Sequence, residues 1–331
     1  MNSAETAAAV TSAETPLLSV EDLKVYYPVK AKNRLSSKVS WLKAVDGVSL
    51  DVLPNETVGI VGESGCGKST LGKAIAGLLK PTGGSLSFEG RPYSSIGHRE
   101  RAKNIQIVFQ DPYSSLDPRM TVGASIEEPL AVIEKLPRKE RKERGLQLME
   151  EVGLRPDQYD RFPHEFSGGQ RQRIGIARAL ATNPKLVVCD EAVSALDVSI
   201  QAQILNLIDD LKSRYHLSFL FISHNLSVVE HICDKVAVMY LGHIVEYGDV
   251  DAIFDNPRHP YTQALLDAIP QIKVDGQAQL RGIEGDVPSA IDLPSGCCFH
   301  TRCPRATAEC ANCAPSLVQV GENHWCACPL Q

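Results

Sequence analysis

The sequence predicts an α/β fold built on a mostly parallel β-sheet. Five short, continuous apolar runs have the length expected of strands covered on both faces. They are residues 57–61, 105–109, 185–189, 217–222 and 235–239. Amphipathic stretches separate some of them, as at residues 200–215. Buried strands that alternate with helices indicate a parallel sheet with crossover helices.

The remaining segments add smaller parts to this sheet. Residues 17–25 and 44–52 alternate apolar and polar positions, which is typical of antiparallel strands with one solvated face. Residues 71–79 are predicted to form a helix, and the pattern from about 121 to 180 is helical, with interruptions at Pro and Gly-rich loops. Near residue 270 this regular pattern ends, and a tail rich in Gly, Pro and Cys follows.

Composition excludes several classes of protein. The 331 residues carry a formal net charge of −6, which argues against a protein that coats nucleic acid, so no nucleic-acid partner is expected. No apolar run approaches the roughly 18 residues that span a bilayer. Residues 1–16 have no basic segment typical of a secretory signal and are expected to form a disordered leader.

A glycine-rich turn after the first apolar run has the pattern of a phosphate-binding loop. GESGCGKS at 62–69 fits G-x-x-x-x-G-K-[ST], with a predicted strand before it and a helix after it. The glycines let backbone N–H groups surround phosphate oxygens, and the helix N-terminus adds positive charge. Lys68 is expected to reach the β- and γ-phosphates and Ser69 to hold Mg²⁺. The expected nucleotide contacts are Gly62, Glu63, Ser64, Gly65, Cys66, Gly67, Lys68, Ser69 and Thr70.

Two acids follow the strand predicted at 185–189. Asp190 ends this run beside the phosphate loop, which places it to bind Mg²⁺, often through water. Glu191 comes next and is expected to orient or deprotonate the water that attacks the terminal phosphate.

FSGGQ at 166–170 opens a predicted helix and offers further free N–H donors to a phosphate. With these motifs in this order, residues 17–265 resemble the ABC transporter ATPases. The resemblance implies that Ser167, Gly168, Gly169 and Gln170 contact ATP bound by a partner subunit. Phe166 departs from the commoner Leu of that signature.

Other positions match the same family in order. Gln110 resembles the Q-loop glutamine, which senses Mg²⁺ and the membrane subunit, and Asp197 of SALD resembles the D-loop aspartate at the dimer seam. His224 resembles the switch histidine that contacts the γ-phosphate. Tyr27 lies where the family stacks an aromatic ring on adenine, with Tyr26 as a competitor. The implied catalytic set is Glu191, His224 and Gln110, and the implied Mg²⁺ ligands are Ser69, Gln110 and Asp190.

The resemblance also implies the architecture. The fold class is a P-loop NTPase, with a RecA-like mostly parallel sheet, an antiparallel β subdomain, a helical signature subdomain and a Cys-rich C-terminal extension. Residues 17–270 would form the ABC nucleotide-binding domain, with the helical subdomain at about 115–180. Residues 271–331 would form the extension.

Three stretches, at 108–123, 190–207 and 256–266, narrow the resemblance to ATP-binding subunits of dipeptide and oligopeptide importers. This implies a second ATP-binding subunit, identical or different, and two transmembrane permeases. An extracytoplasmic substrate-binding protein would act indirectly, and the chain would lie peripherally on the cytoplasmic face of the inner membrane. The alternatives are an importer for nickel chelates or sugars, and a soluble ABC ATPase with a redox-sensing metal tail.

Seven of the ten cysteines lie in the last 35 residues. Without an export signal, a metal or cluster is favoured over disulfides. The importer subfamily often carries a [4Fe–4S] cluster there, and the matching ligands are Cys297, Cys303, Cys310 and Cys328. Zn²⁺ also accepts four thiolates and is the second interpretation, and incidental thiols are the third.

Overall fold

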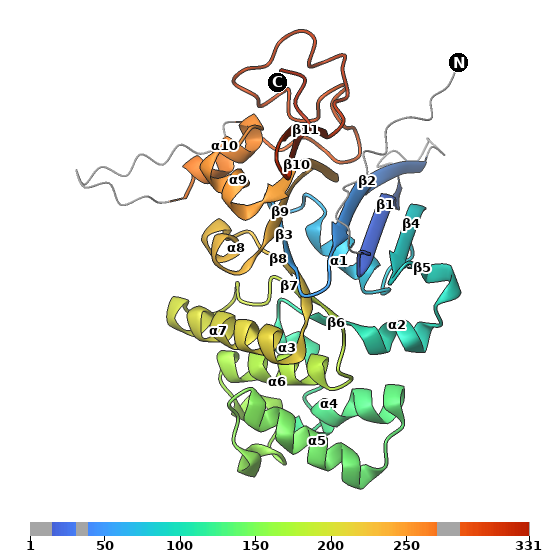
Figure 1. The fold of residues 1–331 in the computed structure, drawn as a ribbon, viewed down its shortest axis with the longest axis vertical. Helices are drawn as coiled ribbons and strands as arrows, with labels where there is room; N and C mark the ends of the chain where they lie inside the picture. The colour runs from blue at the N-terminus through green and yellow to red at the C-terminus, as the bar shows by residue number, and fades with distance from the viewer. Residues whose placement is uncertain (1–14, 31–38, 270–284, 331) are drawn as a thin grey trace, which may run out of the picture.

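The computed structural model describes residues 15–30, 39–269 and 285–330. Two sheets lie side by side in the upper part of the molecule, and a group of helices forms the lower part (Figure 1). The predicted leader at 1–16 lies almost wholly outside the described residues.

The smaller sheet is antiparallel. Its order is β2 (Val39–Val52), β1 (Leu18–Lys30), β4 (Gly83–Phe88) and β5 (Arg91–Pro92). The two alternating runs therefore form paired strands, as predicted, and both are longer than the sequence pattern indicated. Their pairing continues from Leu18 opposite Val52 to Lys30 opposite Val39, so the partner strand sustains an extended backbone beyond the clear alternation.

The larger sheet contains eight strands in the order β11-β12-β10-β9-β3-β8-β7-β6. All five predicted buried runs lie in its parallel part. Their bounds are β3 (Thr57–Val61), β6 (Ile105–Val108), β7 (Leu186–Asp190), β8 (Ser218–Ile222) and β9 (Lys235–Tyr240). Parallel pairing brings the carboxyl ends of these strands to one edge of the sheet, where ligands bind in open α/β folds.

The tail extends this sheet. β10 (His243–Asp249) pairs antiparallel with β9, and β12 (His324–Cys326) and β11 (Val318–Gly321) follow it. No periodic pattern predicted β11 and β12, because strands of four and three residues are too short to show one. Gly248 permits the close approach of β10 to the residue before β12, since a Cβ at Gly248 would lie 2.6 Å from the Asn323 carbonyl oxygen.

The helices cover the sheet faces and form the lower part of Figure 1. The helix predicted at 71–79 starts earlier, at Lys68, and ends at Ile75, because Gly77 with a φ of 74° turns the chain away. The helices are α1 (Lys68–Ile75), α2 (His98–Asn104), α3 (Pro112–Ser115), α4 (Val122–Pro129), α5 (Arg138–Glu151), α6 (Gly168–Leu180), α7 (Val198–Tyr215), α8 (Leu226–Ile232), α9 (Val250–Asp255) and α10 (Pro260–Asp267).

Two hydrophobic clusters form the core, one on each face of the large sheet. Along β7, Val187 and Cys189 belong to one cluster, and Leu186 and Val188 belong to the other. Tail residues join both: Phe299 lies in the first cluster, while Trp325 packs against the second. The tail is therefore packed onto the rest of the protein rather than around a core of its own.

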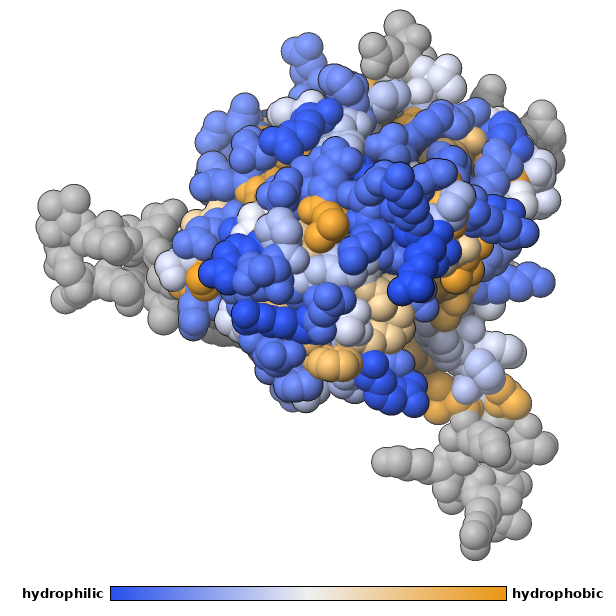
Figure 2. Space-filling model, turned by 90° about the horizontal axis from the view of Figure 1, so that it is seen from below, coloured by the Kyte–Doolittle hydropathy of each residue, from blue (hydrophilic) through white to orange (hydrophobic). Residues whose placement is uncertain are grey.

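Figure 2 views the molecule from the helical end. Polar and charged side chains dominate this face, and apolar residues are scattered over it. Within the described ranges, no helix has the length and apolar character needed to cross a membrane.

Candidate functional site

The loop between β3 and α1 has a backbone that only glycine accommodates at Gly67. Its φ is 111°, and a Cβ there would lie 2.0 Å from the carbonyl oxygen of Ala44. At Gly65, in contrast, a Cβ would meet no heavy atom of the described residues within 4 Å. The loop is thus packed tightly on the protein at Gly67 and open at Gly65, as a loop that receives a ligand on its backbone must be.

Lys68 lies inside the curve of this loop and is 4% exposed. Its Nζ donates to the carbonyl oxygens of Gly62 at 2.7 Å and Glu63 at 2.9 Å. These bonds hold the ammonium group among the loop atoms, where an incoming phosphate would meet it. Cys66, also in the loop, has its thiol pKa raised by burial, so it is not a reactive thiolate.

Ser69 and Asp190 meet directly across the site. The Ser69 hydroxyl donates to Oδ1 of Asp190 at 2.6 Å, although the two residues are 121 positions apart. Asp190 is buried at the carboxyl end of β7. A hydroxyl and a carboxylate are hard oxygen ligands of the kind that Mg²⁺ prefers, so this pair fits the expected Mg²⁺ site.

Glu191, Gln110 and His224 follow β7, β6 and β8, three neighbouring strands. Nε2 of Gln110 donates to Oε2 of Glu191 at 2.7 Å, and Nδ1 of His224 lies 3.5 Å from the same oxygen. Glu191 has a φ of 50°, and such a backbone in a non-glycine residue is often found at functional sites. The structure therefore brings these three predicted residues together beside Asp190.

The signature residues lie elsewhere in the chain. Ser167 caps α6: its Oγ accepts a bond from the Gln170 N–H, and the Gln170 side chain accepts one from the Ser167 N–H. A Cβ at Gly168 would lie 3.5 Å from Leu196, and one at Gly169 would lie 2.5 Å from Ile200, so both glycines pack against the segment around Asp197. Among the described residues, no hydrogen bond or ion pair joins 167–170 to the phosphate loop.

The two tyrosines on β1 differ in environment. The Tyr26 hydroxyl donates to Asp46, and Nζ of Lys43 lies 5.7 Å from its ring centroid. Burial and the bond to Asp46 raise the pKa of Tyr26. Tyr27 packs, partly buried, against one hydrophobic cluster.

Comparison with known proteins connects this geometry to a family. Residues 45–194 match the ABC transporter model, and residues 245–310 match the model for the oligopeptide/dipeptide transporter C-terminal region. The dipeptide transport ATP-binding protein DppF of Haemophilus influenzae is 50% identical over 317 residues, covering 95% of this chain and 96% of that protein. The oligopeptide transport ATP-binding protein OppF of Escherichia coli is 51% identical over 316 residues, covering 93% and 95%.

This chain belongs to the ABC transporter ATP-binding subunits of the dipeptide and oligopeptide importer branch. As such a subunit it is an ATPase. Two solved structures share the fold. The ATP-binding cassette MJ0796, a dimer bound to ADP and phosphate, has a TM-score of 0.61 at 26% identity and covers 70% of this chain and 98% of its own. CbiO1 of Clostridium perfringens has a TM-score of 0.62 at 29% identity and covers 73% and 92%.

Among the described residues of this ATPase subunit, two side chains outside the predicted nucleotide-site residues hold the phosphate loop. The hydroxyl of Tyr261, on α10, accepts a bond from the Glu63 N–H at 2.8 Å. Arg302, in the tail, donates to both carboxylate oxygens of Glu63 at 2.7 and 3.1 Å. Arg302 lies 239 positions from Glu63, so no local sequence pattern could have identified it.

The four predicted tail ligands occupy one region. The Cys297 N–H donates to the Cys310 carbonyl at 2.8 Å, and Cys310 and Cys328 both act electrostatically on the Cys297 and Cys303 thiols. Burial raises the pKa of Cys297 to about 11 and also raises that of Cys303. Within the described residues, however, no three His, Cys, Asp or Glu side chains form a group that could hold a metal ion.

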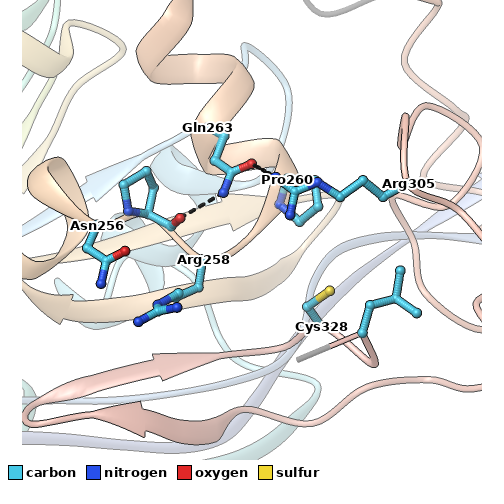
Figure 3. Close-up of a pocket in the computed structure, with 8 residues that line it drawn as sticks. Asn256, Arg258, Pro260, Gln263, Arg305 and Cys328 are labelled. Carbon is cyan, nitrogen blue, oxygen red and sulfur yellow. Dashed lines mark hydrogen bonds between the residues drawn. The ribbon is translucent and has the colours of Figure 1, made fainter.

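A separate cavity of about 420 Å³ lies between α9, α10 and the tail (Figure 3). Arg258 and Arg305 line it, and the Arg305 guanidinium donates to Gln263. Of the predicted site residues, only Cys328 lines this cavity. It is thus distinct from the phosphate loop.

Proposed function

We propose that this ATPase subunit powers the uptake of dipeptides or oligopeptides through an ABC importer. One observation carries the ATPase part of the proposal: the continuous set of contacts from Ser69 to Asp190 and, through adjacent Glu191, to Gln110 and His224. The peptide substrate is supported by the match of residues 245–310 to the oligopeptide/dipeptide transporter C-terminal region. The related DppF and OppF proteins carry dipeptide and oligopeptide transport in their names.

Each residue has a proposed role in hydrolysis. The backbone of residues 62–70 and the Lys68 ammonium bind the phosphates of ATP. Mg²⁺ is held by Ser69, Gln110 and Asp190, and Tyr27 stacks on adenine. Glu191 orients and deprotonates the attacking water, while Gln110 and His224 stay within reach of the same carboxylate. Gln110 is also proposed to sense contact with the membrane subunit and to transmit it to the ATP site.

The subunit works as one half of a dimer of ATP-binding subunits. Ser167, Gly168, Gly169 and Gln170 are proposed to complete the ATP site of the partner, with Asp197 at the seam. The capping box uses the N–H groups of Ser167 and Gln170, and the Gly168 and Gly169 N–H groups at the same helix start are proposed to bind the partner's phosphate. Two transmembrane permeases and an extracytoplasmic binding protein complete the assembly, which places the chain on the cytoplasmic face of the inner membrane.

The tail is proposed to carry a [4Fe–4S] cluster on Cys297, Cys303, Cys310 and Cys328. Cys310 and Cys328 lie near enough to the Cys297 and Cys303 thiols to act on them electrostatically, whereas Cys313 is exposed, which supports this choice. A four-iron cluster takes one thiolate per iron, so its ligands need not converge on one point as zinc ligands do. The four side chains would anchor the tail.

The test is co-purification followed by transport. The tagged chain is isolated from its native membranes in mild detergent, and the complex is reconstituted in vesicles. We expect two polytopic permeases and a second ATP-binding subunit, and ATP-dependent uptake of labelled di- or oligopeptide. Uptake of nickel chelates or sugars instead of peptides would overturn the substrate, and recovery free of membrane subunits would overturn the transport role.

A further inference from the structure

Within the part of the tail that the structure describes, the Arg302 side chain contacts the phosphate loop. The side chain of Arg302 is 4% exposed, and its guanidinium binds the Glu63 carboxylate through two parallel bonds, Nη1 to Oε2 at 2.7 Å and Nη2 to Oε1 at 3.1 Å. The Tyr240 hydroxyl lies 3.5 Å from Nη1. Bidentate pairs of this kind are stronger and more directional than a single charged bond.

Glu63 is the second residue of the phosphate loop, and besides a bond from the Cys66 N–H to its carbonyl, three side chains among the described residues hold it. Its carbonyl oxygen accepts from Nζ of Lys68, its N–H donates to Tyr261, and its carboxylate accepts from Arg302. A displacement of Glu63 would therefore move the carbonyl that holds the phosphate-binding ammonium.

The charge of Glu63 makes this contact matter for ATP. A carboxylate in a loop that binds a triphosphate repels the ligand, and this repulsion is large where water is scarce. Arg302 neutralises that carboxylate through its two hydrogen bonds. Loss of Arg302 alone would leave an unpaired anion in the loop, which is worse than having neither charge.

The Arg302 backbone is itself fixed. It lies in a run of turns in which the His300 N–H donates to the Cys297 carbonyl and the Arg302 N–H donates to the Phe299 carbonyl, both at 3.0 Å. The Phe299 ring packs against Tyr240 and Tyr261 with centroid distances of 5.3 Å. Arg302 is thus held by an ordered turn between two predicted thiol ligands, Cys297 and Cys303.

We propose that Arg302 is a positioning residue through which the C-terminal tail sets the affinity of the phosphate loop for ATP. The proposal rests on the nucleotide site assigned above. It gives the tail a function in the ATPase cycle even though the tail contributes none of the residues assigned to hydrolysis.

The test compares four variants of the full chain in its assembled complex. They are Arg302→Met, Arg302→Lys, Glu63→Gln and the double variant that combines Arg302→Met with Glu63→Gln. We expect Arg302→Met to raise KM for ATP roughly tenfold while kcat stays within about twofold. The double variant should recover most of that loss, because no unpaired carboxylate remains. Arg302→Lys keeps the charge without the fork and should give an intermediate KM.

Arg305→Met is the matched control. Arg305 lies in the same tail beside Cys303, but its guanidinium contacts Gln263 rather than the loop. The Arg305→Met variant should keep the KM for ATP of the unmodified protein. If Arg302 serves only the stability of the tail, Arg302→Met will lower the melting temperature and kcat, KM will be unchanged and the double variant will not recover; this result overturns the proposal.

Equilibrium binding of ATP to Lys68→Ala separates this proposal from the assigned nucleotide site. If Lys68→Ala loses ATP binding but Arg302→Met keeps the normal KM, only the role of Arg302 fails. If Lys68→Ala binds ATP normally, the phosphate-loop assignment itself fails.

Discussion

Nε2 of Gln110 donates to Oε2 of Glu191 at 2.7 Å, although the two residues are 81 positions apart in the sequence. This bond joins the segments that follow the neighbouring strands β6 and β7. The same carboxylate oxygen lies 3.5 Å from Nδ1 of His224. A neutral amide and an imidazole therefore orient one carboxylate beside Asp190. This geometry suits a base that positions water for attack on a phosphate.

Replacing Glu191 by glutamine removes that base and keeps the side-chain shape. We expect Glu191→Gln to bind ATP but to hydrolyse it about 10² to 10⁴ times more slowly, the range for loss of a general base. Steady-state phosphate release and ATP retention on the purified dimer measure the two effects.

Glu230→Gln is the control for this substitution. It removes the same charge from a residue that is exposed on α8. It should hydrolyse ATP at the normal rate. Near-normal hydrolysis by Glu191→Gln would remove Glu191 from the catalytic role.

The sequence predicted the central part of the fold because its signals are local. Five continuous apolar runs became the five parallel strands, and the loop at 62–69 lies between β3 and α1. Since parallel strands end at one edge, the residues after β6, β7 and β8 had to meet there. The contacts of Gln110, Glu191 and His224 follow from this rule.

The tail contacts could not be predicted in the same way. The Arg302–Glu63 pair joins positions 239 residues apart, and its two partners lie in segments with no shared pattern. β12 exists because three residues complete the edge of β10, which depends on tertiary packing rather than on propensity. The strand β10 itself was missed, although Ile244, Val245 and Tyr247 are buried apolar residues around Glu246.

His259 predicts a loss of stability in mild acid. Burial lowers its pKa to about 4, and its Nδ1 accepts a bond from the Tyr261 N–H, which needs the neutral ring. Because the unfolded pKa is about 6.5, the unfolded chain binds more protons between these values. The contribution of neutral His259 to the free energy of unfolding is therefore fully present above pH 6.5. It decreases as the pH falls toward 4, and the loss is about 2 kcal/mol at pH 5.

Melting temperatures at pH 7.5 and pH 5 measure this dependence. His259→Asn keeps a cap acceptor that does not titrate, and it should flatten the pH dependence. His231→Asn changes an exposed histidine and should leave the dependence intact. Equal slopes for His259→Asn and the unmodified chain would contradict the assignment.

Phe299 predicts that the tail contributes to the stability of the whole subunit. Its side chain is 1% exposed and packs against Tyr240, Tyr261 and His259. Phe299→Ala should reduce the free energy of unfolding by about 3–5 kcal/mol. Phe162→Ala removes a phenylalanine that is 37% exposed and should have a much smaller effect. Similar losses in both variants, measured by denaturant unfolding, would show that the tail does not stabilise the core through Phe299.

The tail thiols predict a metal content that distinguishes iron–sulfur from zinc. Protein purified without oxygen should contain about four irons and about four acid-labile sulfides per chain, as a [4Fe–4S] cluster requires.

Cys303→Ser removes a half-buried thiol that Cys310 and Cys328 influence, and it should lower the iron content strongly. Cys313→Ser removes an exposed thiol outside the assigned set and should retain iron. One zinc per chain without sulfide would exclude the cluster, and iron loss in Cys313→Ser would exclude the assigned ligands.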